Sequence, residues 1–337
     1  MNIKRVLTTV DTHTAGGPTR TVVAGLPPLA GSSVAAKMDD FRNRHDALRK
    51  LLMWEPRGHR DMFGAVLTPP CHPEAALGAF FLTSAGYLRA CVHSSIGLAT
   101  AGLETGFIGE ESIKPDGSIP LETPAGVVSL FPQYAGDRLE TIAIRTRPAF
   151  VYSREESLQG TLPKPLQVSI VYSGVFFVLV DVAQPGASFP ELKPENAAQL
   201  APLGMALLAA ANRQFDVRHP ENPEVRSLDL VMLYENVNDH QARDIVIGRS
   251  GGVDRSPCGA GAGAKMVLEH SRGRLQPGAE YVLDSFLATR FRGRLVEPCQ
   301  VGPHSGAIPE IRGAAYITGM HQFVLDPHDP LQEGFLF

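Results

Sequence analysis

Residues 91–97 (CVHSSIG) and residues 258–264 (CGAGAGA) are two short segments that match each other about half a chain apart. Each begins with a cysteine, Cys91 or Cys258, and continues with small residues and then apolar residues at helical spacing. Fifteen residues after each cysteine stands a glycine, Gly106 or Gly273, the residue type that commonly ends a helix. The cysteines are 258 − 91 = 167 positions apart in a chain of 337 residues. We therefore expect a degenerate duplication in which each half presents a cysteine at a helix N-terminus; the alternative is chance similarity between two helices rich in small residues.

The rest of each half is predicted to combine strands with one long helix. In the first half, β-branched and apolar runs predict strands at 3–10, 21–23, 65–67, 78–83, 127–130 and 141–147. Residues 33–54 have helical periodicity, which ends before Pro56. In the second half, strands are predicted within 168–180 and at 227–234 and 245–247, and helices at 194–214 and after Cys258. Residues 163–165 are the expected crossing between the halves, and the last 25 residues are apolar enough to dock on a core.

Composition and charge exclude several classes of function. Hydrophobic residues make up 44% of the chain and charged residues 20%, as in ordinary globular proteins, and the length favours two subdomains. The net charge of −4 gives no basic footprint for nucleic acid or anionic lipid. The N-terminus lacks the apolar run of a signal peptide, and the most apolar stretch, 167–180, is too short to cross a bilayer. We therefore expect a cytoplasmic protein without nucleic-acid or membrane partners.

The four cysteines have neither the CxxC spacing nor the neighbouring histidines of a zinc site, so no metal is expected. A large core needs no disulfide framework, and we expect free thiols in a reducing compartment. Cys71 and Cys299 stand beside prolines in loops and are expected to be bystanders.

Cys91 and Cys258 are the candidates for chemistry. A helix N-terminus carries a partial positive charge and unpaired N–H groups, which favour a thiolate and can hold a substrate carboxylate. Two such helices facing each other would place a thiolate and a thiol on opposite faces of a bound amino acid, one to remove the Cα proton and one to return a proton. Asp254 could accept a hydrogen bond from the substrate ammonium, and His93 could donate to its carboxylate or tune the thiol. The alternative for Cys258 is a buried structural cysteine in a glycine-rich turn.

Two nucleotide-binding alternatives fail on spacing. Residues 259–263 do not form a phosphate-binding loop, because the lysine comes too late, at Lys265. They also lack a preceding strand with the GxGxxG pattern of a dinucleotide fold.

Five ordered motifs together resemble the proline racemase family, which includes hydroxyproline 2-epimerases and trans-3-hydroxyproline dehydratases. Two of them, residues 90–93 (ACVH) and 254–261 (DRSPCGAG), contain the two cysteines and are similar to the family patterns MCGH and DRSPCGTG. The supporting segments are 11–20 (DTHTAGGPTR), 55–64 (EPRGHRDMFG) and 318–322 (TGMHQ). The resemblance therefore covers essentially the whole chain.

The resemblance implies an α/β (α+β), diaminopimelate-epimerase-like fold with two pseudo-symmetric subdomains and the active site in the cleft between them. The first subdomain would comprise residues 1–155 and 312–337 and carry Cys91; the second would comprise 156–311 and carry Cys258. Catalysis would use these two cysteines as acid/base thiols without cofactor or metal, on a small amino-acid substrate. The remaining substrate-binding residues would be Val92, His93, Asp254, Gly259, Ala260 and Phe63. The family also makes a homodimer plausible.

Several residues depart from the family pattern. Val92 replaces a glycine beside the carboxylate site, Ala260 replaces a threonine, and Gly17 replaces a glutamate. Phe63 matches one of two aromatic residues that enclose the substrate ring, whereas the other position is Gly248. This opening favours a hydroxyproline as an alternative to proline.

Four functions stay open at this point. They are racemisation of proline, 2-epimerisation of 4-hydroxyproline, dehydration of trans-3-hydroxy-L-proline, and amino-acid binding without catalysis. Cys258 weighs against dehydration, because that branch typically has threonine there. His13, His59 and His321 also lie in family motifs, but a structural role is expected for them and for Arg57.

Overall fold

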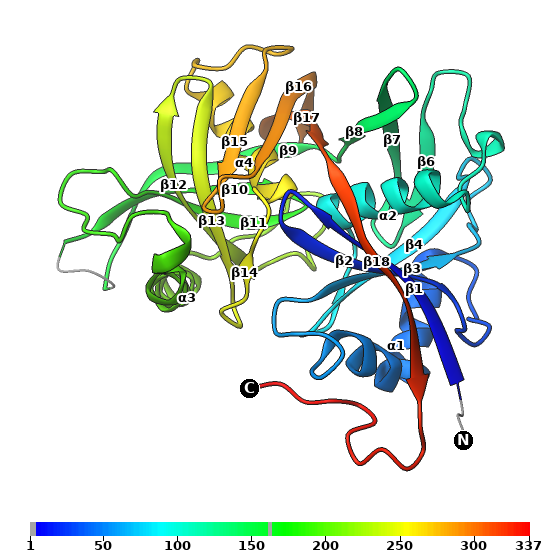
Figure 1. The fold of residues 1–337 in the computed structure, drawn as a ribbon. Helices are drawn as coiled ribbons and strands as arrows, with labels where there is room; N and C mark the ends of the chain where they lie inside the picture. The colour runs from blue at the N-terminus through cyan, green and yellow to red at the C-terminus, as the bar shows by residue number, and fades with distance from the viewer. Residues whose placement is uncertain (1–4, 161–163) are drawn as a thin grey trace. The chain divides into compact units, whose positions relative to one another are not determined.

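The computed structural model describes residues 5–160 and 164–337, which divide into two compact units (Figure 1). The first unit runs to Ile144 and also contains Gly313–Phe337; the second is Arg145–Arg312. The division expected at 155 and 156 falls inside a strand, β9 (Ala149–Leu158), and the observed one comes 155 − 144 = 11 residues earlier. The crossing expected at 163–165 lies partly outside the described residues, and its described part belongs to the second unit.

The strands of the second unit form a closed ring. In order they are β9 (Ala149–Leu158), β10 (Leu166–Ser173), β11 (Val175–Asp181), β12 (Leu228–Asn238), β13 (Gln241–Gly248), β15 (Tyr281–Ser285), β16 (Arg290–Val301) and β17 (His304–Gly313). Pairing of β17 with β9 at Gly306↔Phe150 closes the ring, so these eight strands leave no open edge. The pairs β11–β12 and β13–β15 are parallel and the others antiparallel. The short strand β14 (Val253–Asp254) pairs with β13.

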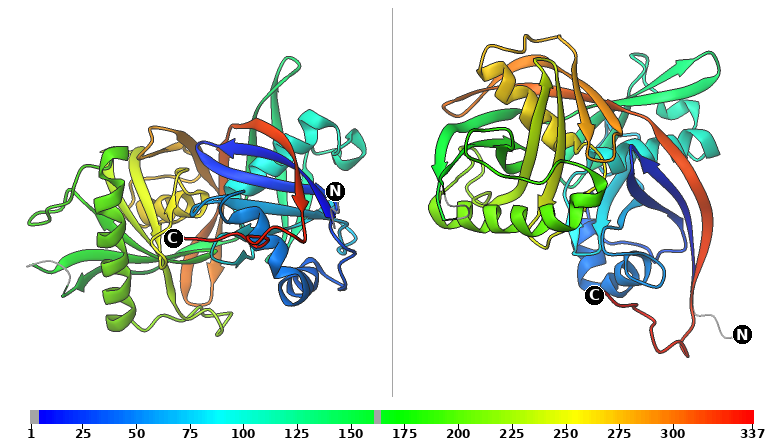
Figure 2. Two further views of the ribbon diagram at one scale, coloured as in Figure 1. Left: turned by 60° about the horizontal axis from the view of Figure 1, so that its bottom comes forward. Right: turned by 60° about the vertical axis from the view of Figure 1, so that its left-hand side comes forward.

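Two helices pack on this ring in different ways. Helix α3 (Ala197–Gln214), preceded by the 3-10 turn η2 (Pro194–Asn196), contacts β12 and β13 and lies along the outside (Figure 2). Helix α4 (Gly259–Ser271) contacts β9, β10, β11 and β16, and its residues from Gly261 to Glu269 are all buried. Near its start the helix approaches β10 so closely that only a small residue fits: a Cβ at Gly263 would lie 2.6 Å from the Ser173 hydroxyl. The glycines of this segment therefore let the helix enter the core.

The first unit repeats the same order of elements. Its strands are β18 (Ala315–Leu325), β1 (Arg5–Thr14), β2 (Gly17–Ala24), β3 (Phe63–Thr68), β4 (Leu77–Thr83), β6 (Ile119–Thr123) and β7 (Gly126–Ala135), paired in that order. As in the second unit, the third and fourth strands in this order are parallel, and so are the fifth and sixth. These pairs are β2–β3 and β4–β6, equivalent to β11–β12 and β13–β15. The short β5 (Tyr87–Leu88) pairs with β4 as β14 does with β13. Strand β8 (Arg138–Arg145) and the 3-10 turn η1 (Glu110–Ser112) complete the described elements of this segment.

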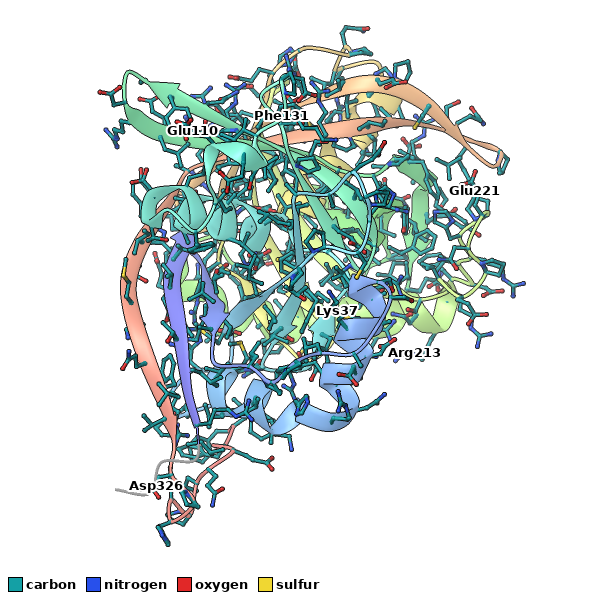
Figure 3. All side chains as sticks on the ribbon, turned by 90° about the vertical axis from the view of Figure 1, so that its right-hand side faces the viewer. Lys37, Glu110, Phe131, Arg213, Glu221 and Asp326 are labelled. Carbon is teal, nitrogen blue, oxygen red and sulfur yellow. The ribbon has the colours of Figure 1, made fainter. Side chains whose placement is uncertain are left out.

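The helices of the first unit occupy equivalent places in the chain. Helix α1 (Val34–Met53) joins β2 to β3 and begins at Ser33, whose side chain accepts a hydrogen bond from the Ala36 N–H. Helix α2 (Val92–Thr105) follows β5 and ends at Gly106, whose φ of 78° is left-handed. Lys37 of α1, labelled in Figure 3, donates to the Pro69 carbonyl at 2.6 Å. The duplication expected from the two cysteine segments is therefore present in the element order, and the expected α/β class is confirmed.

The C-terminal segment docks on the first unit, as its apolar composition predicts. Strand β18 pairs with β1 along its length, and Asp326, labelled in Figure 3, follows its end. Further along the segment, Glu333 Oε2 lies 2.6 Å from Lys50 Nζ, and Phe335 forms an isolated antiparallel β-bridge with Glu55. Within the described part of the chain, none of the helices has the length and apolar character needed to cross a membrane.

Candidate active site

Cys91 is the residue before the first turn of α2, as predicted. Its backbone is extended, with φ −153° and ψ 115°, and its side chain is half-buried. The Sγ atom lies 3.2 Å from the Ser94 hydroxyl oxygen and 3.6 Å from Nδ1 of His93. The thiol is therefore within hydrogen-bonding reach of one hydroxyl and one imidazole of its own helix.

The first unit gathers four of the predicted site residues around this point. His93 is buried, and its ring meets Phe63 of β3 edge to face, with centroids 4.6 Å apart. Its carbonyl accepts a hydrogen bond from the Thr14 hydroxyl at 2.8 Å. Val92 is half-buried at the first helical position. The ring contact with Phe63 and the carbonyl contact with Thr14 fix His93 on both sides.

Cys258 takes the equivalent place before α4, but in a different conformation. Its φ of 47° is on the left-handed side, which side chains rarely adopt, and its exposed fraction is 6%. The Sγ atom accepts a hydrogen bond from the Gly261 N–H at 3.4 Å. Burial, and then the carboxyl groups of Asp254 and Asp244, raise the pKa of the Cys258 thiol well above its usual range. This environment favours the protonated thiol.

The remaining predicted residues of the second unit surround Cys258. Asp254 ends β14, and its Oδ1 accepts from the Ser256 N–H at 2.9 Å and from the Ser256 hydroxyl at 2.8 Å. Gly259 is buried and Ala260 half-buried in the first turn of α4. The site residues expected in each unit are thus neighbours within that unit.

Gly248, the position at which the resemblance implies an aromatic residue, ends β13. A Cβ built on it would meet only Leu230 Cδ2 at 3.6 Å and the Gly252 carbonyl oxygen at 3.9 Å, which are ordinary contact distances. The backbone thus accepts a side chain at this position, and glycine leaves that space open.

Asp244 was not predicted from the sequence. It lies on β13, its side chain is fully buried, and among the described residues neither carboxyl oxygen has a hydrogen-bond partner. Burial, helped by Asp254 and Asp284, raises its pKa well above the usual range, so the neutral acid is favoured. The only sequence signal is an acidic residue beside the apolar run 245–247.

The histidines in the other motifs make structural hydrogen bonds or pairs. Nδ1 of His13 accepts from the Gly16 N–H at 3.3 Å, and Nδ1 of His59 accepts from the Asp61 N–H at 3.2 Å. His321 Nε2 lies 3.7 Å from Asp11. A structural role was expected for Arg57, either holding a carboxylate such as Asp61 or orienting a loop.

The observed partner of Arg57 is instead Asp329, at 2.6 Å, in the C-terminal segment. Cys71 is exposed and Cys299 half-buried, and both are free thiols. Among residues 5–160 and 164–337, no three His, Cys, Asp or Glu side chains are grouped so that they could hold a metal ion.

Comparison with known proteins finds similar proteins over nearly the whole chain. Residues 9–336 match the family model described as proline racemase. The proline racemase of Clostridioides difficile is 36% identical over 340 residues, covering 100% of this chain and 99% of that protein. The 4-hydroxyproline 2-epimerase of Streptosporangium roseum is 35% identical over 337 residues, covering 100% of both.

The fold is similar to that of a solved relative. A crystal structure of a hydroxyproline epimerase from Agrobacterium vitis, with bound trans-4-hydroxy-L-proline, has a TM-score of 0.88 and 30% identity to this chain. The match covers 100% of this chain and 96% of that one. The fold implied by the sequence motifs is thereby confirmed.

Proposed function

Since the chain belongs to the proline racemase family and is an amino-acid racemase or epimerase, we propose that it inverts Cα of proline or a hydroxyproline with Cys91 and Cys258 as two acid/base thiols. One observation carries the proposal: each cysteine precedes the first turn of the equivalent helix in a repeated unit. Such a position favours an anionic ligand and a reactive thiol. No cofactor is needed in this mechanism.

Each turnover moves two protons. A thiolate takes the Cα proton, so the C–H bond breaks, an S–H bond forms, and the electron pair stays on the substrate as a carbanion stabilised by its carboxylate. The opposite thiol then gives its proton to the other face, forming the new C–H bond and leaving a thiolate. The enzyme ends with the two protonation states exchanged, and N–H groups at the helix starts would stabilise the developing charge.

The surroundings of the two thiols suggest their resting states. Burial of Cys258, and then the neighbouring carboxylate of Asp254, disfavour a negative charge on its sulfur. Cys91 is half-buried and within reach of the Ser94 hydroxyl and the His93 ring. We therefore assign the thiolate of the resting enzyme to Cys91 and the thiol to Cys258.

Substrate groups can be assigned to the same residues. N–H groups at the starts of α2 and α4, from Val92, His93, Gly259 and Ala260, would bind the carboxylate. The second oxygen of Asp254 would accept from the substrate ammonium, since Oδ1 is used by Ser256.

Phe63 would flank the ring, and the open space at Gly248 favours a hydroxyproline, whose hydroxyl adds volume. Dehydration of trans-3-hydroxy-L-proline is the second candidate, because it shares the first proton abstraction. Cys258 argues against it, since that reaction needs no second base.

The proposal is tested by incubating the protein in D2O, without added cofactor, with L-proline, trans-4-hydroxy-L-proline or trans-3-hydroxy-L-proline. Deuterium should enter Cα as the opposite stereoisomer appears, followed by NMR. Cys91→Ala and Cys258→Ala should each abolish inversion, whereas the matched controls Cys71→Ala and Cys299→Ala should retain it. Loss of water from the 3-hydroxy compound alone would identify a dehydratase, and no exchange with any of the three would leave a different substrate or amino-acid binding without catalysis.

A further inference from the structure

We propose that Ser94 is a positioning residue whose hydroxyl stabilises the thiolate of Cys91, an inference that rests on the proposed role of Cys91 as a base. Ser94 lies three residues after Cys91, on the same side of the first turn of α2. Its side chain is fully buried, and its Oγ is 3.2 Å from Cys91 Sγ. It is therefore the hydroxyl placed to respond when that sulfur changes charge.

A hydrogen-bond count at Ser94 favours the thiolate. The Thr19 hydroxyl donates to Ser94 Oγ at 3.2 Å, so one acceptor position of Ser94 is filled from β2. A serine hydroxyl has one proton to donate. If Cys91 is a thiol that donates to Ser94, the serine accepts twice and its own proton has no acceptor among its contacts in the described chain. If Cys91 is a thiolate, the serine donates to sulfur and every group of the chain Thr19–Ser94–Cys91 is satisfied. A thiol that donates to the His93 ring could also accept from Ser94, but a neutral sulfur is a weak acceptor, so the serine bond is stronger to the thiolate.

Packing holds this chain of hydroxyl groups in place. A Cβ at Gly97, one turn further along α2, would lie 2.5 Å from the Thr12 hydroxyl, so the helix sits directly on β1 and β2. The Thr14 hydroxyl donates to the His93 carbonyl at 2.8 Å and fixes the backbone beside Ser94. The serine hydroxyl consequently needs no rearrangement to meet the sulfur.

His93 is an ionisable group close to the Cys91 thiol, with its ring nitrogens 3.6 and 3.9 Å from Sγ. The other ionisable groups of the strands packed against α2 have partners of their own. Arg20 pairs with Asp11 at 2.8 Å, and His321 lies 3.7 Å from the same carboxylate. Among the remaining groups of these strands, Arg5 donates to the Gly25 carbonyl and His13 accepts from Gly16. The Tyr316 ring contacts the His13 ring, with centroids 5.4 Å apart.

Ser95 supplies a matched control. It is the next residue of the same turn and is also buried, but its hydroxyl donates to the Cys91 carbonyl oxygen at 2.7 Å. A Ser95→Ala variant therefore removes a buried hydroxyl of the same size without removing a hydrogen bond to sulfur.

The test is the rate of Cys91 alkylation by iodoacetamide between pH 5 and 10, in the full-length protein, with each cysteine followed by peptide mass spectrometry. The thiolate is the reactive form. Loss of one hydrogen bond to a charged group should lower the rate at pH 7 by about tenfold in Ser94→Ala and move the midpoint of the profile up by about one pH unit. Ser95→Ala should keep the wild-type midpoint, and Ser94→Thr should restore it.

Coinciding profiles for Ser94→Ala and the wild type would overturn the inference. If Ser94→Ala does not fold, Thr19→Val gives a second test, because it removes the donor to Ser94 and should shift the midpoint in the same direction. Its control is Thr21→Val, which removes a buried hydroxyl without a partner in the described structure and should leave the midpoint unchanged. An unshifted Thr19→Val profile would then count against the hydroxyl chain.

Alkylation requires no turnover, so the result is separate from the test of the proposed function. A shifted profile in Ser94→Ala, together with Cα exchange that survives in Cys91→Ala, would keep the inference and reject Cys91 as a catalytic base. If both ideas hold, kcat/KM of Ser94→Ala should fall at neutral pH and recover at alkaline pH.

Discussion

The conformation of Cys258 makes a prediction about the sign of a stability change. At φ 47° the residue occupies a region that costs an L-amino acid about 1–2 kcal/mol and costs glycine almost nothing. At an ordinary position, changing alanine to glycine destabilises a protein by about 0.5–1 kcal/mol, through the greater freedom of the unfolded chain. Relief of the backbone conformation therefore outweighs that loss at this site. Cys258→Gly should be more stable than Cys258→Ala by about 0.5–1 kcal/mol, the difference of these two terms.

The same pair of variants at Cys91 is the control, because φ there is −153°, an extended conformation open to every residue. Cys91→Gly should be less stable than Cys91→Ala by about 0.5–1 kcal/mol. Urea unfolding followed by far-UV circular dichroism measures both differences, and equal m values would show that the unfolded states are comparable. If the glycine variant is the less stable one at both cysteines, the Cys258 backbone is not strained and the reasoning is refuted. All four variants should lack Cα exchange.

Two further predictions concern buried ionisable side chains of the second unit, on α4 and β13. Lys265 and Glu269 form a buried ion pair, in which burial lowers the pKa of Lys265 to about 8. Glu269→Leu should therefore lower the free energy of unfolding in urea by about 3–5 kcal/mol, and adding Lys265→Met should recover most of that loss. Equal losses in the single and double variants would contradict this. Asp244 has a raised folded-state pKa, so the folded protein holds a proton that the unfolded chain releases above about pH 4, and stability is lost as pH rises. Asp244→Asn should therefore gain stability relative to wild type more at pH 7 than at pH 4.5, and a gain independent of pH would count against a neutral Asp244.

Local patterns in the sequence predicted the elements that carry the site. The helix starts after Cys91 and Cys258 follow from small residues and a later glycine, and α1 follows from its periodicity and its end before Pro56. The strand pairs β10–β11 and β12–β13 follow from long apolar runs.

The strands that close the second unit were missed, for a physical reason. Strand β16 has the sequence RFRGRLVEPCQV and mixes charges with single apolar residues, because one face meets solvent. Strand β9 contains the charged run 154–156, so no apolar run marks it. Such strands are fixed by pairing with distant partners, and for the same reason the unit boundary was predicted 155 − 144 = 11 residues too late.

Two residues of the site region escaped prediction because their role depends on tertiary contacts. Ser94 is one of several small residues at a helix start, and only the approach of Thr19 from β2 gives its hydroxyl a direction. Asp244 contradicts the usual exclusion of unpaired carboxyl groups from a core, so no pattern leads to it.

The pairing of β1 with β18 has a consequence for biosynthesis. Arg5 lies opposite Leu325, so these partners are 325 − 5 = 320 positions apart, and the strand that β1 needs is synthesised after the whole of the second unit. The second unit is continuous in sequence, so the pairing that closes its ring does not depend on any segment outside it. The first unit begins earlier but finishes later, and until then β1 presents a strand edge to the cell. Synthesis of β18, rather than synthesis of the N-terminal half, is the event that completes the unit carrying Cys91.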